Sequence, residues 1–322
     1  FPFAAKNILL AHPGVTDLPR ADADAIVDKT HAACQNNQEF GGFLQTVKET
    51  RTAAARLIGA KPQEIALLGP TSLGLSLVAR GLSWRKGDEV VYYQDDYPAN
   101  VYPWLEQQRR GAVVRYLHAP EPGAITPELI ESELTPKTRL VALASCHFVT
   151  GYRIDIDAIG RLLREHGVLF SLDAIQTCGA FATPVEHVDF LSADAHKWLL
   201  GPTAIGIFYV RKELFETLRP TLLGAWNVHS PDFITQEGIR FHPTARRYEP
   251  GVLNTAGIMG MRAALEMLLE IGIERVSARL LELKAHLVSR LDALGCEIHG
   301  PREGPAASSI TTFFPAAGSA PE

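Results

Sequence analysis

Cysteine is scarce in this chain, which has four in 322 residues. The four are far apart, and none belongs to a Cys-x-x-Cys pair or to a His/Cys cluster with zinc-ligand spacing. The sequence therefore predicts neither a disulfide framework nor a metal site, and a reducing, cytoplasmic compartment is the simplest expectation. The four residues are Cys34, Cys146, Cys178 and Cys296.

Long hydrophobic runs and an excess of basic charge are also missing. No apolar segment approaches the roughly 20 residues that a membrane-spanning helix needs, and no secretory signal pattern opens the chain. With 31 Lys and Arg against 36 Asp and Glu, the formal net charge is −5, so no basic surface argues for nucleic acid. The composition is 46% hydrophobic and 21% charged, as in an ordinary globular protein. We expect neither a membrane partner nor a nucleic-acid partner.

Short apolar runs alternate with helical patterns through the middle of the chain. The predicted strands are 64–68, 89–93, 112–117, 139–144, 168–172, 188–192 and 204–210. The predicted helices are 21–33, 43–58, 73–82, 99–110, 127–133, 156–166, 254–271 and 274–294, the last two separated by Gly272. This alternation predicts an α/β fold with a mainly parallel seven-stranded sheet and helices on both faces. The last two strands are joined by too short a segment for a crossover helix, so that pair is expected to be antiparallel.

The segment 192–202, Ser-Ala-Asp-Ala-His-Lys-Trp-Leu-Leu-Gly-Pro, places Lys197 between the last two predicted strands. Lysine is rarely buried without a partner, but a desolvated amine is a nucleophile that forms Schiff bases with carbonyl groups. The alternative is an ordinary surface lysine in a loop. A second polar residue upstream favours the chemical interpretation.

That residue is Asp173, which directly follows the apolar run 168–172. The carboxyl ends of parallel strands are where open α/β sheets bind ligands. A carboxylate there can pair with the ring nitrogen of pyridoxal 5′-phosphate (PLP), whose aldehyde requires a lysine. Gln176 can reach the same ligand if the chain turns after the strand. By itself Asp173 could equally cap a helix, and its pairing with Lys197 is what favours a PLP site.

A phosphate site is predicted where Thr71 and Ser72 open a helix after a short strand. Free backbone N–H groups and the helix dipole attract anions at such a start, although an ordinary helix cap is the commoner use of this pattern. Tyr97 follows another strand and could stack on an aromatic ring or pack on its own helix.

Together these motifs resemble the class V aminotransferase family of PLP-dependent enzymes, which includes the cysteine desulfurases and proteins like isopenicillin N epimerase. The resemblance is carried by His196-Lys197, by the Asp-x-x-Gln motif at 173–176 and by Tyr-Glu-Pro-Gly-x-x-Asn-Thr at 248–255, in the family's order and spacing. The segments 96–104 and 196–202 are similar to the epimerase-like branch.

This resemblance implies the type I PLP-dependent aminotransferase fold and gives single residues a role. Lys197 would form the Schiff base with PLP, Asp173 would hold the pyridine nitrogen, and both would be catalytic. Gln176 would bind the ring hydroxyl, and Tyr97 occupies the place of a stacking residue. The other cofactor-binding residues that it implies are Thr71, Ser72, His147, His196 and Trp226.

Several positions depart from the desulfurase pattern. Asp194 stands where many relatives have a serine that touches the phosphate, so we expect its carboxylate to point away or to pair with a cation. Val252 replaces a threonine that reaches the partner subunit in the desulfurases. The arginines 240, 246 and 247 could bind a substrate carboxylate or a partner's phosphate, or could form a solvated cluster paired with Glu237 or Glu249.

The resemblance also implies a domain division and an activity. It predicts an N-terminal arm over 1–20, a large PLP-binding domain over 21–250, and an interdomain helix with a small, incomplete C-terminal domain over 251–322. A homodimer with shared active sites would act on a small amino acid through Lys197. Transamination, epimerisation and elimination stay open, as do a cysteine desulfurase or lyase, an amino-acid epimerase, and a non-catalytic PLP-fold binding protein.

Overall fold

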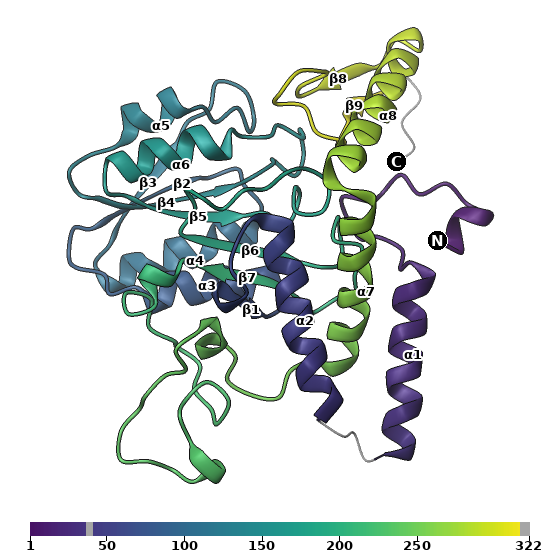
Figure 1. The fold of residues 1–322 in the computed structure, drawn as a ribbon. Helices are drawn as coiled ribbons and strands as arrows, with labels where there is room; N and C mark the ends of the chain where they lie inside the picture. Colours follow the sequence, from purple (N-terminus) through teal and green to yellow (C-terminus); the bar gives the residue numbers. More distant parts are fainter. Residues whose placement is uncertain (37–40, 316–322) are drawn as a thin grey trace.

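Seven strands form one sheet in this computed structural model, which describes residues 1–36 and 41–315 (Figure 1). Their order across the sheet is β1-β7-β6-β5-β4-β2-β3. β7 runs antiparallel to β1 and to β6, and the remaining neighbours are parallel, which confirms the mainly parallel sheet. The strands are β1 (Ile65–Leu67), β2 (Glu89–Tyr93), β3 (Val113–Leu117), β4 (Thr138–Ala144), β5 (Leu169–Asp173), β6 (Phe190–Asp194) and β7 (Gly206–Val210).

Helices cover both faces of this sheet, with α5 and α6 on one side and α3 and α4 on the other (Figure 1). The α-helices are α1 (Arg20–Gln35), α2 (Gly41–Ile58), α3 (Thr71–Gly81), α4 (Tyr102–Leu105), α5 (Pro127–Glu133), α6 (Ile156–Glu165), α7 (Thr255–Ile271) and α8 (Ile273–Ala293). The short 3-10 helices are η1 (Phe3–Ala5), η2 (Pro62–Glu64), η3 (Pro98–Asn100), η4 (Glu106–Arg110), η5 (Lys212–Leu214), η6 (Pro231–Phe233) and η7 (Ala245–Tyr248). In the described part of the chain, no helix is both long enough and apolar enough to cross a membrane.

Strand β2 shows how the apolar runs bury both faces of the sheet. Val91 and Tyr93 belong to the core that α2, α5, α6 and α7 complete, whereas Val90 and Tyr92 pack with α3 and α4. Successive side chains of a strand point to opposite faces, so a continuous apolar run is what a sheet with two covered faces requires.

The last helices lead away from the sheet. Gly272 separates α7 from α8 with a φ of 87°, a conformation that glycine adopts without steric cost, and this confirms the predicted break. α7 packs against α1 and α2. Beyond α8, β8 (Glu297–His299) and β9 (Thr312–Phe314) pair as a separate antiparallel ribbon. The predicted domain division at residue 250 stays a prediction.

The prediction of one continuous helix over 99–110 is wrong. The chain there forms η3, α4 and η4 in succession. Pro103 is the second residue of α4 and has no N–H for a hydrogen bond to the preceding turn. Side-chain bonds link the pieces instead, because Trp104 Nε1 donates to Asn100 Oδ1 at 3.1 Å and Asn100 Nδ2 donates to Asp96 Oδ2 at 3.0 Å.

Replacing Gly74 with alanine is expected to destabilise the fold, although alanine normally favours a helix by about 1 kcal/mol over glycine. A Cβ at this position of α3 would lie 2.3 Å from Ser192 Oγ and 2.9 Å from the Phe208 ring. Overpacking of this kind costs about 1–3 kcal/mol, which urea unfolding would measure. Gly42 of α2 is the matched control, because a Cβ there meets nothing within 4 Å. Equal stability of the Gly74→Ala and Gly42→Ala proteins would contradict the close approach of α3 to the sheet.

Candidate active site

A cavity of about 510 Å³ lies where β5 and β6 end, and it brings seven of the nine predicted site residues together. Those seven are Thr71, Ser72, Tyr97, Asp173, Gln176, His196 and Lys197. The remaining lining residues are Pro13, Gly14, Val15, Pro70, Ala99, Phe148, Ile175 and Asp194. The loops after parallel strands build this cavity, as expected for an open α/β sheet.

Lys197 lies three residues beyond the end of β6. Burial lowers the pKa of its amine, and this effect is opposed by the charges of Asp173 and Asp194. No carboxylate in the described residues lies within ion-pair distance of Nζ, which is 5.5 Å from the centroid of the Tyr97 ring. An amine with a lowered pKa at the wall of a cavity is suited to attack a carbonyl carbon.

Asp173 is the last residue of β5 and is only 2% exposed. Its Oδ1 accepts one hydrogen bond, from the backbone N–H of Ile175 at 3.1 Å. Burial and the neighbouring Asp96 raise the pKa of the Asp173 carboxyl to about 7, against the hydrogen bond from Ile175 and the charge of Lys197. A buried carboxylate with so little hydrogen bonding is stabilised by a cationic partner. The site therefore fits a ligand with a protonated ring nitrogen.

The opposite wall is suited to an anion. Thr71 and Ser72 form the first turn of α3, where backbone N–H groups lack helical partners. The N–H of Asp194 donates to Thr71 Oγ1 at 2.8 Å, so the hydroxyl proton of Thr71 stays available for a ligand. His196 borders the same cavity, with 21% of its side chain exposed.

The N-terminal arm closes one side of the cavity, and no pattern in the sequence predicted this. Gln176 Nε2 donates to the carbonyl of Pro13 at 3.1 Å, while Gln176 Oε1 accepts from Trp198 Nε1 at 2.9 Å. The N–H of Thr16 donates to the carbonyl of His196 at 2.8 Å, and the His12 ring stacks at 4.4 Å on Trp198. Both ends of the Gln176 amide are thus engaged with protein, and a bond to a ring hydroxyl would replace or share one of them.

His147 and Trp226 do not line this cavity. His147 is 7% exposed, and its ring nitrogens contact Thr150 Oγ1 at 2.9 Å and the carbonyl of Asp95 at 3.1 Å. It contacts the cavity indirectly, since its ring lies 5.3 Å from that of Phe148. Trp226 lines a different cavity of about 630 Å³ in the projecting segment between β7 and α7.

The arginines of that segment are engaged in different ways. Arg246 lies over the Trp226 ring, with 5.3 Å between the guanidinium carbon and the ring centroid. Arg247 is buried and pairs with Glu216 at 2.9 Å. Glu249, one of the partners that the sequence suggested for these arginines, pairs instead with Arg51 at 2.5 Å.

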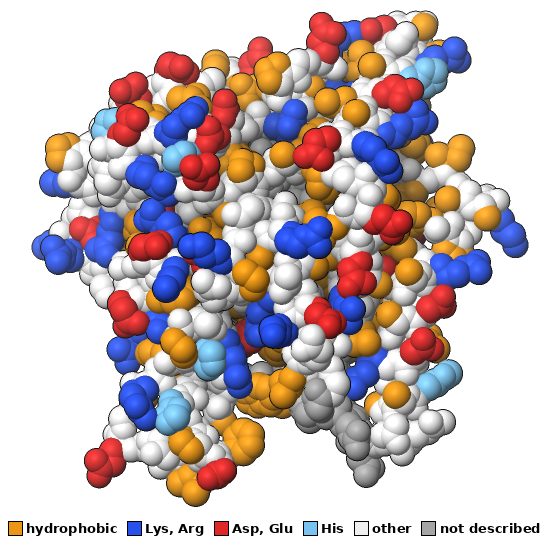
Figure 2. All heavy atoms as spheres, viewed as in Figure 1, with side chains coloured by type: hydrophobic (Ala, Val, Ile, Leu, Met, Phe, Trp, Pro, Cys, Tyr) orange, Lys and Arg blue, Asp and Glu red, His pale blue; other side chains and the backbone are white. Residues whose placement is uncertain are grey.

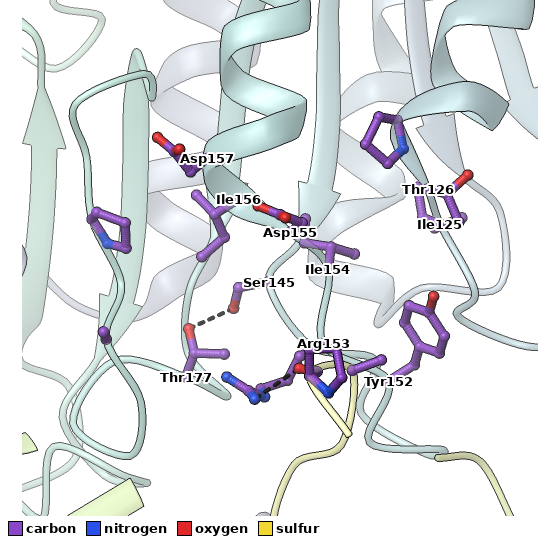
Figure 3. Close-up of a pocket in the computed structure, with 15 residues that line it drawn as sticks. Ile125, Thr126, Ser145, Tyr152, Arg153, Ile154, Asp155, Ile156, Asp157 and Thr177 are labelled. Carbon is purple, nitrogen blue, oxygen red and sulfur yellow. Dashed lines mark hydrogen bonds between the residues drawn. The ribbon is translucent and has the colours of Figure 1, made fainter. Parts of the chain in front are cut away.

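Another cavity, of about 430 Å³, is lined by Ser145, Arg153 and Thr177 among others (Figure 3). Ser145 and Thr177 point toward one another there, joined by a hydrogen bond of 2.8 Å (Figure 3), and Arg153 Nη2 donates to the carbonyl of Pro305 at 2.8 Å. The N–H of Ser145 donates to the carbonyl of Asp173. None of the predicted site residues lines this cavity.

The family model of class V aminotransferases matches residues 21–320. The chain belongs to this family. Its members are PLP-dependent enzymes, and the buried carboxylate, the amine and the anion-binding wall of the cavity suit that cofactor. The recognition made from the motifs is therefore confirmed, and so is PLP as the cofactor.

Similar class V proteins include several that are named cysteine desulfurases. A probable cysteine desulfurase of Methanothermobacter thermautotrophicus is 32% identical over 255 residues, which cover 78% of this chain. The chain spans 63% of the length of that relative. An uncharacterized aminotransferase of Bacillus subtilis, YcbU, is 28% identical over 306 residues, which are 94% of this chain and 80% of that protein.

Solved structures confirm the type I fold. The cysteine desulfurase of Thermococcus onnurineus superposes with a TM-score of 0.89 at 25% identity, over 98% of this chain and 80% of that one. The cystine C–S lyase C-DES superposes with a TM-score of 0.90 at 21% identity, over 99% of this chain and 86% of that one, and so shows the fold alone.

Proposed function

We propose that this class V protein is a PLP-dependent enzyme that acts on a small amino acid, with Lys197 and Asp173 as its catalytic residues. The observation that carries the proposal is one cavity with an amine of lowered pKa, a buried carboxylate and a helix N-terminus on its walls. Each of these features matches one functional group of PLP: the aldehyde, the ring nitrogen and the phosphate.

The binding roles follow from the chemistry of each wall. Thr71, Ser72 and His196 would hold the phosphate, using hydroxyl and ring N–H donors together with the N-terminus of α3. Asp173 would accept a hydrogen bond from the protonated ring nitrogen, which relieves the desolvation of its own carboxylate. Tyr97 is 48% exposed at the edge of the cavity, between Lys197 and Phe148, and we propose that its ring stacks on the planar ligand.

Lys197 would move the proton in the reaction. When bound, PLP withdraws the electron pair that remains on Cα after a bond there is broken. The Lys197 amine takes the Cα proton as a general base and returns it as a general acid, and its lowered pKa keeps a fraction of the amine neutral for this purpose. The atom and the face that receive the returned proton would decide between transamination and epimerisation, whereas elimination would require a leaving group to depart from Cβ of the substrate.

A small substrate fits the remaining walls. Gly14, Val15 and Ala99 present little side-chain volume to the cavity, and Pro13 is held in place by Gln176. In the described part of the chain, the basic side chains that line the cavity are His196 and Lys197. The cavity of about 510 Å³ has to hold PLP as well as the substrate, and this limited volume is what favours a small amino acid.

The decisive experiment mixes the purified protein with PLP and then adds single amino acids in both enantiomeric forms. We expect PLP bound to the protein to show a visible absorption band that differs from the band of PLP alone in buffer. With one substrate, we expect a keto acid, the opposite enantiomer or an elimination product, each measured by chromatography. A protein that binds PLP and turns over none of the amino acids would instead be the non-catalytic binding protein that the sequence left open.

Cysteine desulfuration is the second candidate, because similar class V proteins carry that name. The four cysteines of this sequence do not suit desulfuration. Burial raises the pKa of Cys146 and of Cys178 to about 12, and neither Cys34 nor Cys296 lines the cavity. With L-cysteine as substrate, alanine and a protein persulfide would show desulfuration on a nucleophilic thiol. Pyruvate, ammonia and sulfide would show elimination, which needs no such thiol.

A second copy of the chain is the partner that we propose. The segment between β7 and α7 projects from the molecule and carries exposed apolar side chains, which gather at its lower end in Figure 2. The exposed large apolar side chains of this segment are Leu222, Leu223, Phe233, Ile234, Ile239 and Val252. Exposed apolar groups in such number are unfavourable in water and are typical of an interface.

The Phe233→Asp variant is expected to shift a dimer to monomers, because a charge would be buried between the two copies. Light scattering after gel filtration would measure the mass of each protein. Tyr102→Asp, at an exposed aromatic residue outside this segment, is the control. A wild-type monomer, or a Phe233→Asp dimer as stable as the wild type, would contradict the proposed interface.

A further inference from the structure

We propose that Asp194 is a positioning residue, whose carboxylate holds the His196 ring so that the ring donates a hydrogen bond to the cofactor's phosphate. This inference rests on the proposed function. It assigns a role to an acid beside an anion site, although simple electrostatics predicts that the Asp194 carboxylate weakens the binding of the phosphate. The geometry of the Asp194 carboxylate decides between the two expectations.

Both carboxylate oxygens of Asp194 are directed at its own loop. The residue ends β6 and is 3% exposed. Oδ1 accepts from the N–H of Ala195 at 2.9 Å, and Oδ2 lies 3.0 Å from His196 Nδ1. The backbone N–H of Asp194 is fixed in turn by its bond to Thr71 Oγ1. The carboxylate therefore accepts one backbone hydrogen bond and lies in contact with the His196 ring, which is the basic group nearest to it in its own loop.

This contact leaves one nitrogen of His196 for the ligand. Nδ1 lies 3.0 Å from Asp194 Oδ2 but is buried without a hydrogen-bond partner, so a small rotation of the ring would be needed for it to donate to the carboxylate. Nε2 is the other polar atom of the ring, and it makes no hydrogen bond to any residue that the structure describes. A carboxylate that accepts one ring N–H fixes the orientation of the imidazole and the nitrogen it presents. The backbone of His196 is also anchored, because its carbonyl accepts from the N–H of Thr16 at 2.8 Å.

A phosphate oxygen requires a donor, so in the loaded site both ring nitrogens would carry protons. One proton faces Asp194 and the other faces the phosphate, and the charged ring lies between two anions. Charge-assisted hydrogen bonds of this kind are stronger than neutral ones. Asp194 is thereby separated from the phosphate by the cation that it orients, and its removal weakens the donor rather than relieving repulsion.

The test compares PLP with pyridoxal, which lacks the phosphate, in titrations followed by protein fluorescence. Asp194→Asn and His196→Gln are each expected to weaken PLP binding by about 10-fold or more, the size of effect typical of lost positioning contacts. Binding of pyridoxal is expected to change less than about 2-fold, since it makes no phosphate contact. The double variant is expected to bind PLP no more weakly than His196→Gln alone, because the two residues act as a unit.

Asp189→Asn is the matched control. Asp189 immediately precedes β6 and is also a buried acid, but it pairs with Arg211 at 2.8 Å at the other end of the strand. Its loss is expected to lower stability and to leave the ratio of PLP affinity to pyridoxal affinity unchanged. The same ratio in Asp194→Asn as in Asp189→Asn would overturn the role of Asp194.

Two outcomes separate this inference from the proposed function. If the wild type binds PLP and Asp194→Asn binds it equally or more tightly, Asp194 repels the phosphate and the positioning role is wrong, while the PLP site stands. If the wild type binds neither PLP nor pyridoxal, both proposals fail. Should Asp194→Asn not fold, long-range ¹H–¹⁵N correlation of the His196 ring in the wild-type holoprotein gives the answer. Two protonated ring nitrogens support the inference, and an unprotonated Nδ1 overturns it.

Discussion

Replacing Lys197 with alanine is expected to lower the turnover of any amino-acid substrate by about 10²–10⁴-fold or more, the contribution of a positioned general base alone. The variant also loses the covalent link to PLP, so the visible absorption of the wild-type holoprotein should change to that of non-covalently bound cofactor. The physical reason is that no other amine lines the cavity in the described part of the chain. Stopped-flow absorbance and product analysis measure the two effects separately.

Two further variants sharpen this test. Lys197→Arg keeps the positive charge but offers no nucleophilic amine, so it should fail as completely as alanine. Lys212→Ala, outside the cavity at the start of η5, should behave as the wild type. Substantial turnover by Lys197→Ala, with the wild-type absorption band intact, would show that another residue carries the chemistry.

Most strands were predictable from the sequence because they are buried apolar runs, and the edge strand β3 is the one of the seven that is mostly half-buried or exposed. All seven predicted strands of the sheet are observed, and the antiparallel pairing of β6 with β7 followed from the short connection between them. The pairing of β1 with β7 did not follow, because β1 is far from β7 in sequence and nothing local specifies its neighbour. Long-range pairing depends on how the whole sheet closes, which local patterns do not encode.

Site residues were predictable where they sit directly at the ends of strands or helices. Asp173 ends β5, and Thr71 opens α3, so the topology of a parallel sheet brings them to one edge. The arm residue Pro13 was not predictable, since it reaches the cavity from an irregular segment through a bond from Gln176. Trp226 lines a different cavity, because its segment between β7 and α7 has little regular structure to fix its direction, and its role toward the cofactor stays a prediction.

Replacing Asp173 with asparagine is expected to weaken PLP binding and to lower turnover by about 10²–10³-fold, because breaking a buried charge pair costs about 3–5 kcal/mol. An amide does not stabilise a protonated ring nitrogen as a carboxylate does. Titration with PLP and steady-state rates at saturating cofactor would measure the two losses. Asp24→Asn, at an exposed acid of α1, is the control and should change neither. A variant that binds PLP as tightly as the wild type would show that Asp173 does not face the ring nitrogen.

The same substitution is expected to stabilise the protein in the absence of PLP, and this effect depends on pH. The folded-state pKa of Asp173, about 7, is raised above its ordinary value of 3.8, so the cofactor-free folded protein holds this proton more tightly than the unfolded chain. In the wild type, the stability that this bound proton contributes is fully present below pH 3.8 and is lost as the pH rises through about 7. The difference corresponds to roughly 4 kcal/mol at most.

In urea unfolding of the cofactor-free protein, Asp173→Asn should therefore raise the free energy of unfolding above that of the wild type by more at pH 8 than at pH 5. PLP reverses the ranking, because a ring cation beside the ionised Asp173 stabilises the wild type and has no charged partner in the variant. A residue that lowers the stability of the empty protein and raises that of the loaded one is held for its ligand rather than for the fold. If Asp173→Asn were less stable than the wild type at both pH values without PLP, the carboxylate would instead serve the fold.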